Sequence, residues 1–141
     1  MSYQTDNIFA RILRGELPCV KVYEDAHTIA FMDIMPQAEG HLLVIPREGA
    51  ASLLDLSAEA ARETIVVVQK LARAAKQAFD APGIQVVQMN GSAAGQTVFH
   101  CHFHVIPRQE DAPLRAHATE PVPTERLEAL AQKVRAALAQ T

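Results

Sequence analysis

The residues best suited to chemistry are three histidines that alternate with apolar residues, namely His100, His102 and His104. In an extended strand successive side chains point to opposite faces, so the three imidazoles are predicted to share one face, about 7 Å apart at twice the strand rise. The apolar residues between them are predicted to face the core. A single histidine on a strand is commonly structural, but packing alone does not account for three in alternation. This segment is therefore the first candidate for an active site.

Two kinds of chemistry fit this pattern. Imidazole nitrogens on a shared face can ligate a divalent metal such as zinc. Alternatively, one histidine is a nucleophile, while its neighbours orient it and contact an anion. The preceding loop of small residues, 90–97, ends in the Gln96 amide and the Thr97 hydroxyl. Its backbone N–H groups and these two side chains can surround phosphate oxygens, which favours the nucleophilic interpretation.

Both helices and strands are expected to position these histidines. Helices are expected at 6–15, 57–79 and 124–139, with Asp6 and Ser57 as N-caps and Gly15 as the first stop. Strands are expected at 20–23, 28–32, 41–45, 84–90 and 99–107, the first two as a hairpin. This order predicts an α+β fold with a mostly antiparallel five-stranded sheet, a long central helix and a short helix near each end.

The long helix is predicted to have more than one apolar face. One stripe contains Ile65, Val68, Ala72, Ala75 and Phe79. Val66 and Val67 lie outside that stripe. Since a helix with two apolar faces is buried on two sides, a second subunit is expected to cover one of them, which predicts a homodimer.

Composition limits the class of protein. The 141 residues are 49% apolar and carry a formal net charge of −3, which suits a single domain over 1–141 and argues against broad nucleic-acid binding. No apolar run reaches the roughly 20 residues of a membrane span, and the N-terminal residues lack the layout of a signal peptide. Two cysteines are too few for a disulfide framework. These features predict a cytoplasmic protein without a membrane partner.

The segment Gly95-Gln-Thr-Val-Phe-His-Cys-His-Phe-His-Val-Ile-Pro-Arg resembles the signature of the histidine triad (HIT) family, His-φ-His-φ-His-φ-φ with φ apolar. Three upstream segments resemble family segments in the same order: Asn7-Ile-Phe-Ala-Arg-Ile, Ala30-Phe-Met-Asp-Ile-Met-Pro-Gln and Gly40-His-Leu-Leu-Val-Ile-Pro-Arg. The resemblance covers about residues 7–108 and leaves 109–141 as a C-terminal extension. It implies a HIT-like fold and a nucleotide hydrolase or transferase. Because the transferase branch typically has Gln at the third histidine, His104 points to the hydrolase branch.

The resemblance also implies a mechanism. His102 would attack the phosphorus of a nucleoside 5′-phosphate, giving a covalent nucleotidyl-histidine that water cleaves, and a backbone carbonyl would hold its ring. Neutral imidazole is a competent nucleophile near pH 7. Gln96, Thr97 and His104 would donate to the phosphoryl oxygens, where charge develops, and His100 would orient the others. No cofactor is implied.

Further residues are assigned to the nucleotide by the same resemblance. Gly95 and Asn90 would contact the phosphate, and Asp33 would accept hydrogen bonds from the ribose hydroxyls. The apolar slot for the base would consist of Ile8, Phe9, Ile12, Phe31, Ile34 and Leu43. A purine nucleotide is the family default, and the leaving group is either an amine or a second nucleotide. Two alternatives stay open: a nucleotide-binding regulatory dimer with little turnover, and a metal-dependent hydrolase that uses the three histidines.

Some bacterial relatives bind a structural zinc ion through two N-terminal cysteines and two histidines. The corresponding positions here are Asn7, Ala10, His41 and Gly49, so both thiolates and one histidine are replaced. We therefore predict that there is no structural metal site, and that His41 is a structural residue.

Overall fold

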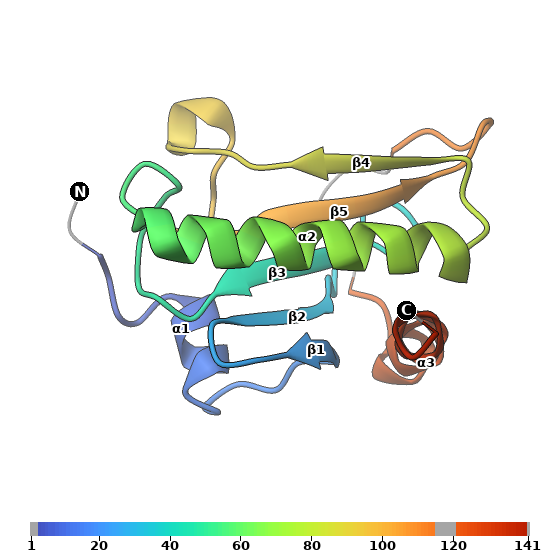
Figure 1. Ribbon diagram of the computed structural model, residues 1–141, viewed down its shortest axis with the longest axis horizontal. Coiled ribbons are helices and arrows are strands. Elements are labelled where there is room, and N and C mark those ends of the chain that lie inside the picture. The colour runs from blue at the N-terminus through green and yellow to red at the C-terminus, as the bar shows by residue number, and fades with distance from the viewer. Residues whose placement is uncertain (1–2, 115–120, 141) are drawn as a thin grey trace.

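The protein forms one antiparallel five-stranded sheet with helices on both faces, as the computed structural model shows for residues 3–114 and 121–140 (Figure 1). The strands are β1 (Lys21–Glu24), β2 (Thr28–Met32), β3 (Leu42–Pro46), β4 (Gly83–Val87) and β5 (Phe103–Arg108). The helices are α1 (Ile8–Leu13), α2 (Ala58–Ala78) and α3 (Thr124–Leu138), with a short 3-10 turn at Ser92–Ala94. The strand order is β1-β2-β3-β5-β4, and every neighbouring pair is antiparallel. The α+β class predicted from the sequence is confirmed.

The two faces of the sheet are packed differently. Alternate residues of β2 take part in different clusters: Ala30 and Met32 join the core shared with α2 and α3, whereas Ile29 and Phe31 join a smaller cluster with Phe9 of α1. Figure 1 shows α2 lying across the sheet, with α3 beside the end that carries β1. A strand buried on both faces reads as a continuous apolar run, which is the pattern of β2 and β3. The face that carries α1 is the less filled of the two.

The long helix α2 begins where its cap predicts, but its buried stripe differs from the expected one. The Ser57 hydroxyl accepts a hydrogen bond from the Ala60 N–H at 3.1 Å. Val67 is buried at 4% exposure, whereas Ile65 is 50% exposed, so the predicted stripe through Ile65 is wrong. Four consecutive apolar residues at 65–68 fit two neighbouring helical faces, and packing decides between them. Across the described parts of the chain, no helix is both long and apolar enough to cross a bilayer.

Two element boundaries near the histidines and near the N-terminus also differ from the prediction. The side chain that caps α1 is Asn7, which accepts from the Ala10 N–H at 2.9 Å, and not Asp6. Strand β5 begins only at Phe103, so His100 and His102 precede it and are not strand residues. The prediction that one strand carries all three histidines is therefore wrong, and the irregular segment before β5 determines where the first two rings lie.

Candidate active site

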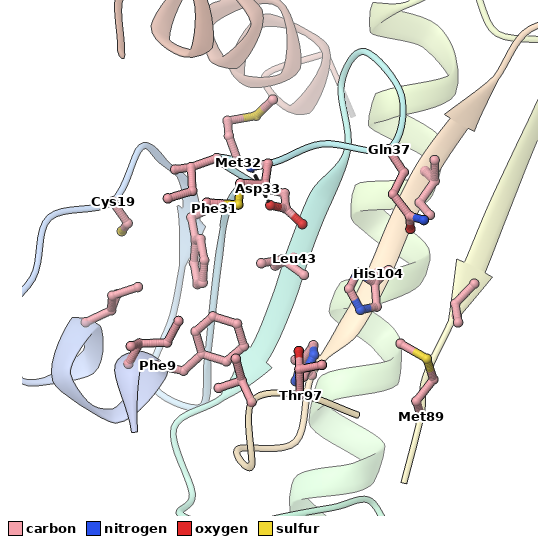
Figure 2. A pocket seen from close by; sticks show the side chains of 18 of the residues that line it. Phe9, Cys19, Phe31, Met32, Asp33, Gln37, Leu43, Met89, Thr97 and His104 are labelled. Carbon is pink, nitrogen blue, oxygen red and sulfur yellow. Dashed lines mark hydrogen bonds between the residues drawn. The ribbon is translucent and has the colours of Figure 1, made fainter. Parts of the chain in front are cut away.

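A cavity of about 840 Å³ lies on the face of the sheet that carries α1. Most of the site residues predicted from the sequence line it: Ile8, Phe9, Ile12, Phe31, Asp33, Ile34, Leu43, Gly95, Thr97, His102 and His104. Figure 2 shows Phe9, Phe31 and Leu43 on one side of this cavity, with Thr97 and His104 on the other. The structure therefore brings together an apolar slot and a histidine end. His100, Gln96 and Asn90 do not line the cavity.

The His102 ring is held by its own segment of backbone. Its Nδ1 lies 2.6 Å from the His100 carbonyl oxygen. A carbonyl can only accept, so Nδ1 carries the ring proton and Nε2 carries the lone pair. The Phe9 ring meets the imidazole edge to face, with centroids 4.9 Å apart, and fixes its plane. In the neutral form of His102, the fold thus leaves Nε2 as the nucleophilic nitrogen.

The His104 ring is held by a residue that lies 63 positions earlier in the chain. The Gln37 backbone N–H donates to Nδ1 of His41 at 3.1 Å, so the proton of the neutral His41 ring is on Nε2. That Nε2 lies 2.9 Å from Nδ1 of His104, which must accept, and the His104 proton is therefore on Nε2. The His102 and His104 ring centroids are 5.1 Å apart. His104 can thus offer an N–H to an oxygen beside the His102 nucleophile.

The contact of His41 with the triad is a feature that sequence reasoning missed. His41 is predicted to be structural, and it is fully buried with its Nε2 2.9 Å from Nδ1 of His104. The strand pairing that brings them together sets Leu43 opposite His104, and this register is a long-range property. The histidine at the start of an apolar strand was the only signal available.

His100 is not among the residues that line the cavity, although the Phe9 ring lies near both its imidazole and that of His102. Its Nε2 donates to the Pro46 carbonyl at 2.8 Å, and its Nδ1 is 2.6 Å from the Tyr3 hydroxyl oxygen. The ring is completely buried, and burial lowers its pKa, although the Pro46 carbonyl acts in the opposite direction. His100 is therefore neutral near pH 7. Its carbonyl holds His102, which places it in the orienting position implied by the resemblance.

The loop before β5 is stabilised by its own hydrogen bonds more than the sequence suggested. The Gln96 amide donates to the Ala51 carbonyl at 2.6 Å and to the Val98 carbonyl at 3.0 Å, and its oxygen accepts from the Gly91 N–H at 2.7 Å. The N–H groups of Gly95 and Gln96 donate to carbonyls of the loop itself. The expectation that Gln96 donates to phosphate is therefore wrong, because its amide is committed to loop structure. Thr97 and Gly95 are the members of this loop that line the cavity.

Asn90 also has a structural task that differs from its predicted phosphate contact. Its Oδ1 accepts from the Leu53 N–H and from Nε2 of Gln88, both at 2.8 Å. Its Nδ2 donates to Oε1 of Gln88 at 2.7 Å. Asn90 thus ties the loop to the segment before α2, and it is not part of the cavity wall.

Asp33 lines the cavity with its carboxylate held in a turn. Oδ1 accepts from the Met35 N–H at 2.8 Å, and Oδ2 lies 3.5 Å from Nε2 of His41. The side chain is nearly buried, at 6% exposure for the residue. Figure 2 shows the carboxylate between the apolar slot and His104, where the sugar of a bound nucleotide would lie if its base filled the slot. This geometry is compatible with the predicted ribose contact.

One group of side chains has the spacing of a metal site. The ligand atoms of Asp33, His41 and His104 lie within 4.8 Å of one another. A cation on Nε2 of His41 would need the lone pair of that atom, but the Gln37 N–H donates to Nδ1, so Nε2 carries the proton. The hydrogen-bond pattern therefore favours a chain of donors over a cation here. This group of Asp33, His41 and His104 also differs from the metal-dependent alternative described above, in which the three histidines of the triad would be the ligands.

The positions of the zinc ligands in bacterial relatives have other uses in this chain. Asn7 caps α1 through the Ala10 N–H. A Cβ added to Gly49 would lie 2.9 Å from the Tyr3 ring, so an aromatic side chain occupies that space. The two cysteines do not supply thiolates: burial raises the pKa of Cys19, and it raises that of Cys101 to about 11.

Comparisons with known proteins agree with this geometry. A HIT domain family model matches residues 14–111. An adenosine 5′-monophosphoramidase of Schizosaccharomyces pombe is 41% identical over 104 residues, 74% of this chain and 75% of that protein. A Hit-like protein from Bartonella henselae has a crystal structure with a TM-score of 0.90, 53% identity and coverage of 96% of this chain and 99% of its own. The crystal structure of a zinc-bound histidine triad family protein from Mycobacterium smegmatis has a TM-score of 0.85 and 36% identity, and the match covers 96% of this chain and 95% of that chain.

Proposed function

Because this chain belongs to the HIT domain family, we propose that it is a nucleotide-binding hydrolase that releases a nucleoside 5′-monophosphate through a covalent intermediate on His102. The observation that carries the proposal is the contact of 2.6 Å between Nδ1 of His102 and the His100 carbonyl. This contact puts the lone pair on Nε2 in a ring that lines the cavity. A neutral imidazole held in one tautomer is suited to nucleophilic catalysis.

The proposed reaction has two displacements at phosphorus. In the first, Nε2 of His102 forms a bond to phosphorus, the bond from phosphorus to the leaving group breaks, and the leaving group takes a proton from water. In the second, another water attacks phosphorus and releases a proton to the solvent, the bond to Nε2 breaks, and His102 returns to its neutral form. In this proposal the N–H of His104 and the hydroxyl of Thr97, both of which line the cavity, donate to the phosphoryl oxygens in both transition states.

The rest of the nucleotide would occupy the other end of the cavity. The base would lie in the slot formed by Phe9, Phe31 and Leu43 with the three predicted isoleucines. Asp33 would accept hydrogen bonds from the ribose hydroxyls, since its Oδ2 faces the cavity while Oδ1 holds the turn. A purine, with its larger apolar face, makes better use of such a slot than a pyrimidine.

For the leaving group we propose an amine, which makes the substrate a nucleoside 5′-phosphoramidate. Beyond His104 the cavity continues past Gln85, Val87 and Met89. Among the lining residues that the structure describes there is neither Lys nor Arg, and the guanidinium of Arg108 donates to Oε1 of the lining residue Gln85 at 2.8 Å. A second nucleotide would bring several phosphate charges into this part of the cavity, and such charges call for cations. A relative that is an adenosine 5′-monophosphoramidase supports the same choice.

The test follows the turnover of adenosine 5′-phosphoramidate by measuring AMP release, and diadenosine tetraphosphate is assayed in parallel. Both assays are run with and without a metal chelator. We expect the phosphoramidate to be cleaved faster, with no change on chelation and an adenylyl adduct on His102 in acid-quenched samples. Tight AMP binding without turnover would favour the regulatory alternative. Loss of activity on chelation would favour the metal-dependent one.

We also propose a homodimer. Ile65 and Val66 of α2 are 50% and 63% exposed, and Val86 of the edge strand β4 is 46% exposed. An exposed apolar helix face beside an unpaired strand edge is typical of an interface. Sedimentation at micromolar concentration is expected to give the mass of two chains, and Val66→Lys to give one. Ala129→Lys, an equal charge change on the exposed side of α3, is expected to leave the dimer intact.

We also propose that the chain is a single domain and that the protein is located in the reducing cytoplasm. Leu127, Leu130 and Val134 of α3 belong to the same core cluster as α2 and the sheet, so the C-terminal extension packs on the remainder of the chain. Both cysteines are free thiols, which is the state expected of a cytoplasmic protein.

A further inference from the structure

The Tyr3 hydroxyl forms a side-chain hydrogen bond between the N-terminal segment and the triad. Its hydroxyl oxygen is 2.6 Å from Nδ1 of His100, and the two rings meet edge to face with centroids 5.6 Å apart. The other nitrogen of His100 donates to the Pro46 carbonyl at 2.8 Å. Since the neutral ring has one proton, Nδ1 is the acceptor and the Tyr3 hydroxyl is the donor.

The contact continues into the nucleophile. Tyr3 and Pro46 hold the His100 ring from both nitrogens, and the carbonyl of the same residue accepts from Nδ1 of His102 at 2.6 Å. This carbonyl lies in the irregular segment before β5, where the N–H of the same peptide unit, that of Cys101, donates to the Ala50 carbonyl at 2.8 Å. The conformation at His100 therefore depends on this one backbone hydrogen bond together with the anchoring of the His100 side chain.

The ring of Tyr3 also fills a defined space. A Cβ on Gly49 would lie 2.9 Å from Cε2 of Tyr3, so the tyrosine ring packs directly against that glycine. Gly49 offers no side chain to His100, and Tyr3 supplies the donor from another part of the chain. The hydroxyl and the ring thus have separate roles, which substitutions can distinguish.

We propose that Tyr3 is a positioning residue of the hydrolase, which fixes the orientation of the His100 ring and, through the His100 carbonyl, the aim of His102. The kinetic consequence rests on the proposed function, whereas the effect on the His100 ring does not. The Pro46 carbonyl keeps the His100 proton on Nε2, so loss of the Tyr3 hydroxyl leaves the tautomer unchanged but leaves Nδ1 of a buried imidazole without its donor, and the ring and its carbonyl are held less firmly.

The test compares Tyr3→Phe with Tyr23→Phe, which removes the hydroxyl of the other tyrosine in the chain. Tyr23 donates to Asp25 at 2.8 Å in the β1–β2 hairpin and is not among the residues that line the cavity. With adenosine 5′-phosphoramidate, Tyr3→Phe is expected to lower kcat about tenfold, while KM and the Kd for AMP change less than about twofold. Tyr23→Phe is expected to keep kcat at the level of the unmodified protein.

A second readout does not depend on turnover. Nitrogen NMR of labelled histidine is expected to show His100 protonated at Nε2 in both proteins, with a shifted Nδ1 signal in Tyr3→Phe because Nδ1 no longer accepts a hydrogen bond. Unchanged His100 signals in that variant, or equal kcat losses in both variants, would overturn the proposal. If the unmodified protein has no hydrolase activity, the proposed function fails, and the NMR comparison still decides whether Tyr3 holds His100. Thermal unfolding of each variant separates these effects from loss of the fold.

Discussion

The two ends of the cavity are built by different physical means. At the histidine end, hydrogen bonds to fixed partners define the protonated nitrogen of each ring: the His100 carbonyl for His102, and His41 for His104. At the apolar end, Phe9, Phe31 and Leu43 belong to one hydrophobic cluster and are held by contact alone. The first arrangement is directional, whereas the second depends on volume and shape.

This difference separates the two kinetic constants. A hydrogen bond that aims a ring at phosphorus matters most in the transition state, so its loss lowers kcat. An apolar contact with the base is the same in the ground state and the transition state, so its loss raises KM and leaves kcat almost unchanged. Asp33 lies between the two ends, where the ribose is expected (Figure 2). From the histidine end of the cavity to the apolar end, substitutions are therefore expected to change from lowering kcat to raising KM.

The largest effect is expected for His102→Asn. This substitution removes the nucleophile and little ground-state contact, so kcat for adenosine 5′-phosphoramidate should fall by at least about 10⁴-fold. The Kd for AMP, measured by calorimetry, should change by less than about threefold. Residual turnover above about 1% would mean that another group attacks phosphorus, and the distinction between the two ends would lose its basis.

The next effect concerns the chain of hydrogen bonds that ends at His104. His41→Leu removes the donor to Nδ1 of His104, so the proton is no longer confined to Nε2, and kcat should fall about 10²-fold, as for loss of one transition-state donor. His41→Gln keeps an N–H on a flexible side chain and should recover most of the activity. His27→Leu, at an exposed histidine of the β1–β2 hairpin, is the matched control. Equal activity of the Leu and Gln variants would show that His41 acts by packing alone.

His41 also shows where prediction from sequence ends. The caps and apolar runs are local signals, and they located α2 through Ser57 and β2 through an unbroken apolar stretch. The contact between His41 and His104 arises from the pairing of β3 with β5, which local signals do not contain. The same limit applies to Tyr3, whose partner is 97 positions away.

Two members of the predicted phosphate loop, Asn90 and Gln96, differ from the prediction for another reason. The residue types at 90–97 are suited to binding an anion, and they are equally suited to binding each other. The Gln96 amide has three partners inside the protein, and Asn90 is bonded to Gln88 and to the Leu53 N–H. Sequence shows which groups can donate or accept, but only the folded backbone shows which of them remain directed at a ligand.

A smaller effect is expected in the middle of the cavity, for Asp33→Asn. The asparagine oxygen can still accept from the Met35 N–H, so the turn is kept while the charge is lost. The preference for AMP over 2′,3′-dideoxy-AMP, measured as a ratio of Kd values, should fall about tenfold, because hydrogen bonds from hydroxyls to a carboxylate are replaced by weaker ones. Equal losses for both nucleotides would assign Asp33 to the turn and not to the ribose.

The smallest effect is expected at the apolar end, for Phe31→Leu. Phe31 lines the slot beside Phe9, and the loss of one aromatic contact with the base is expected to cost about 1 kcal/mol. KM should therefore rise about three- to fivefold, with kcat within about twofold of the unmodified protein. Val44→Ala, on the neighbouring strand but directed into the core on the other face, should lower the melting temperature without changing KM. A fall in kcat for Phe31→Leu as large as that for His41→Leu would mean that the slot also aims the phosphate, so that the two ends act as one unit.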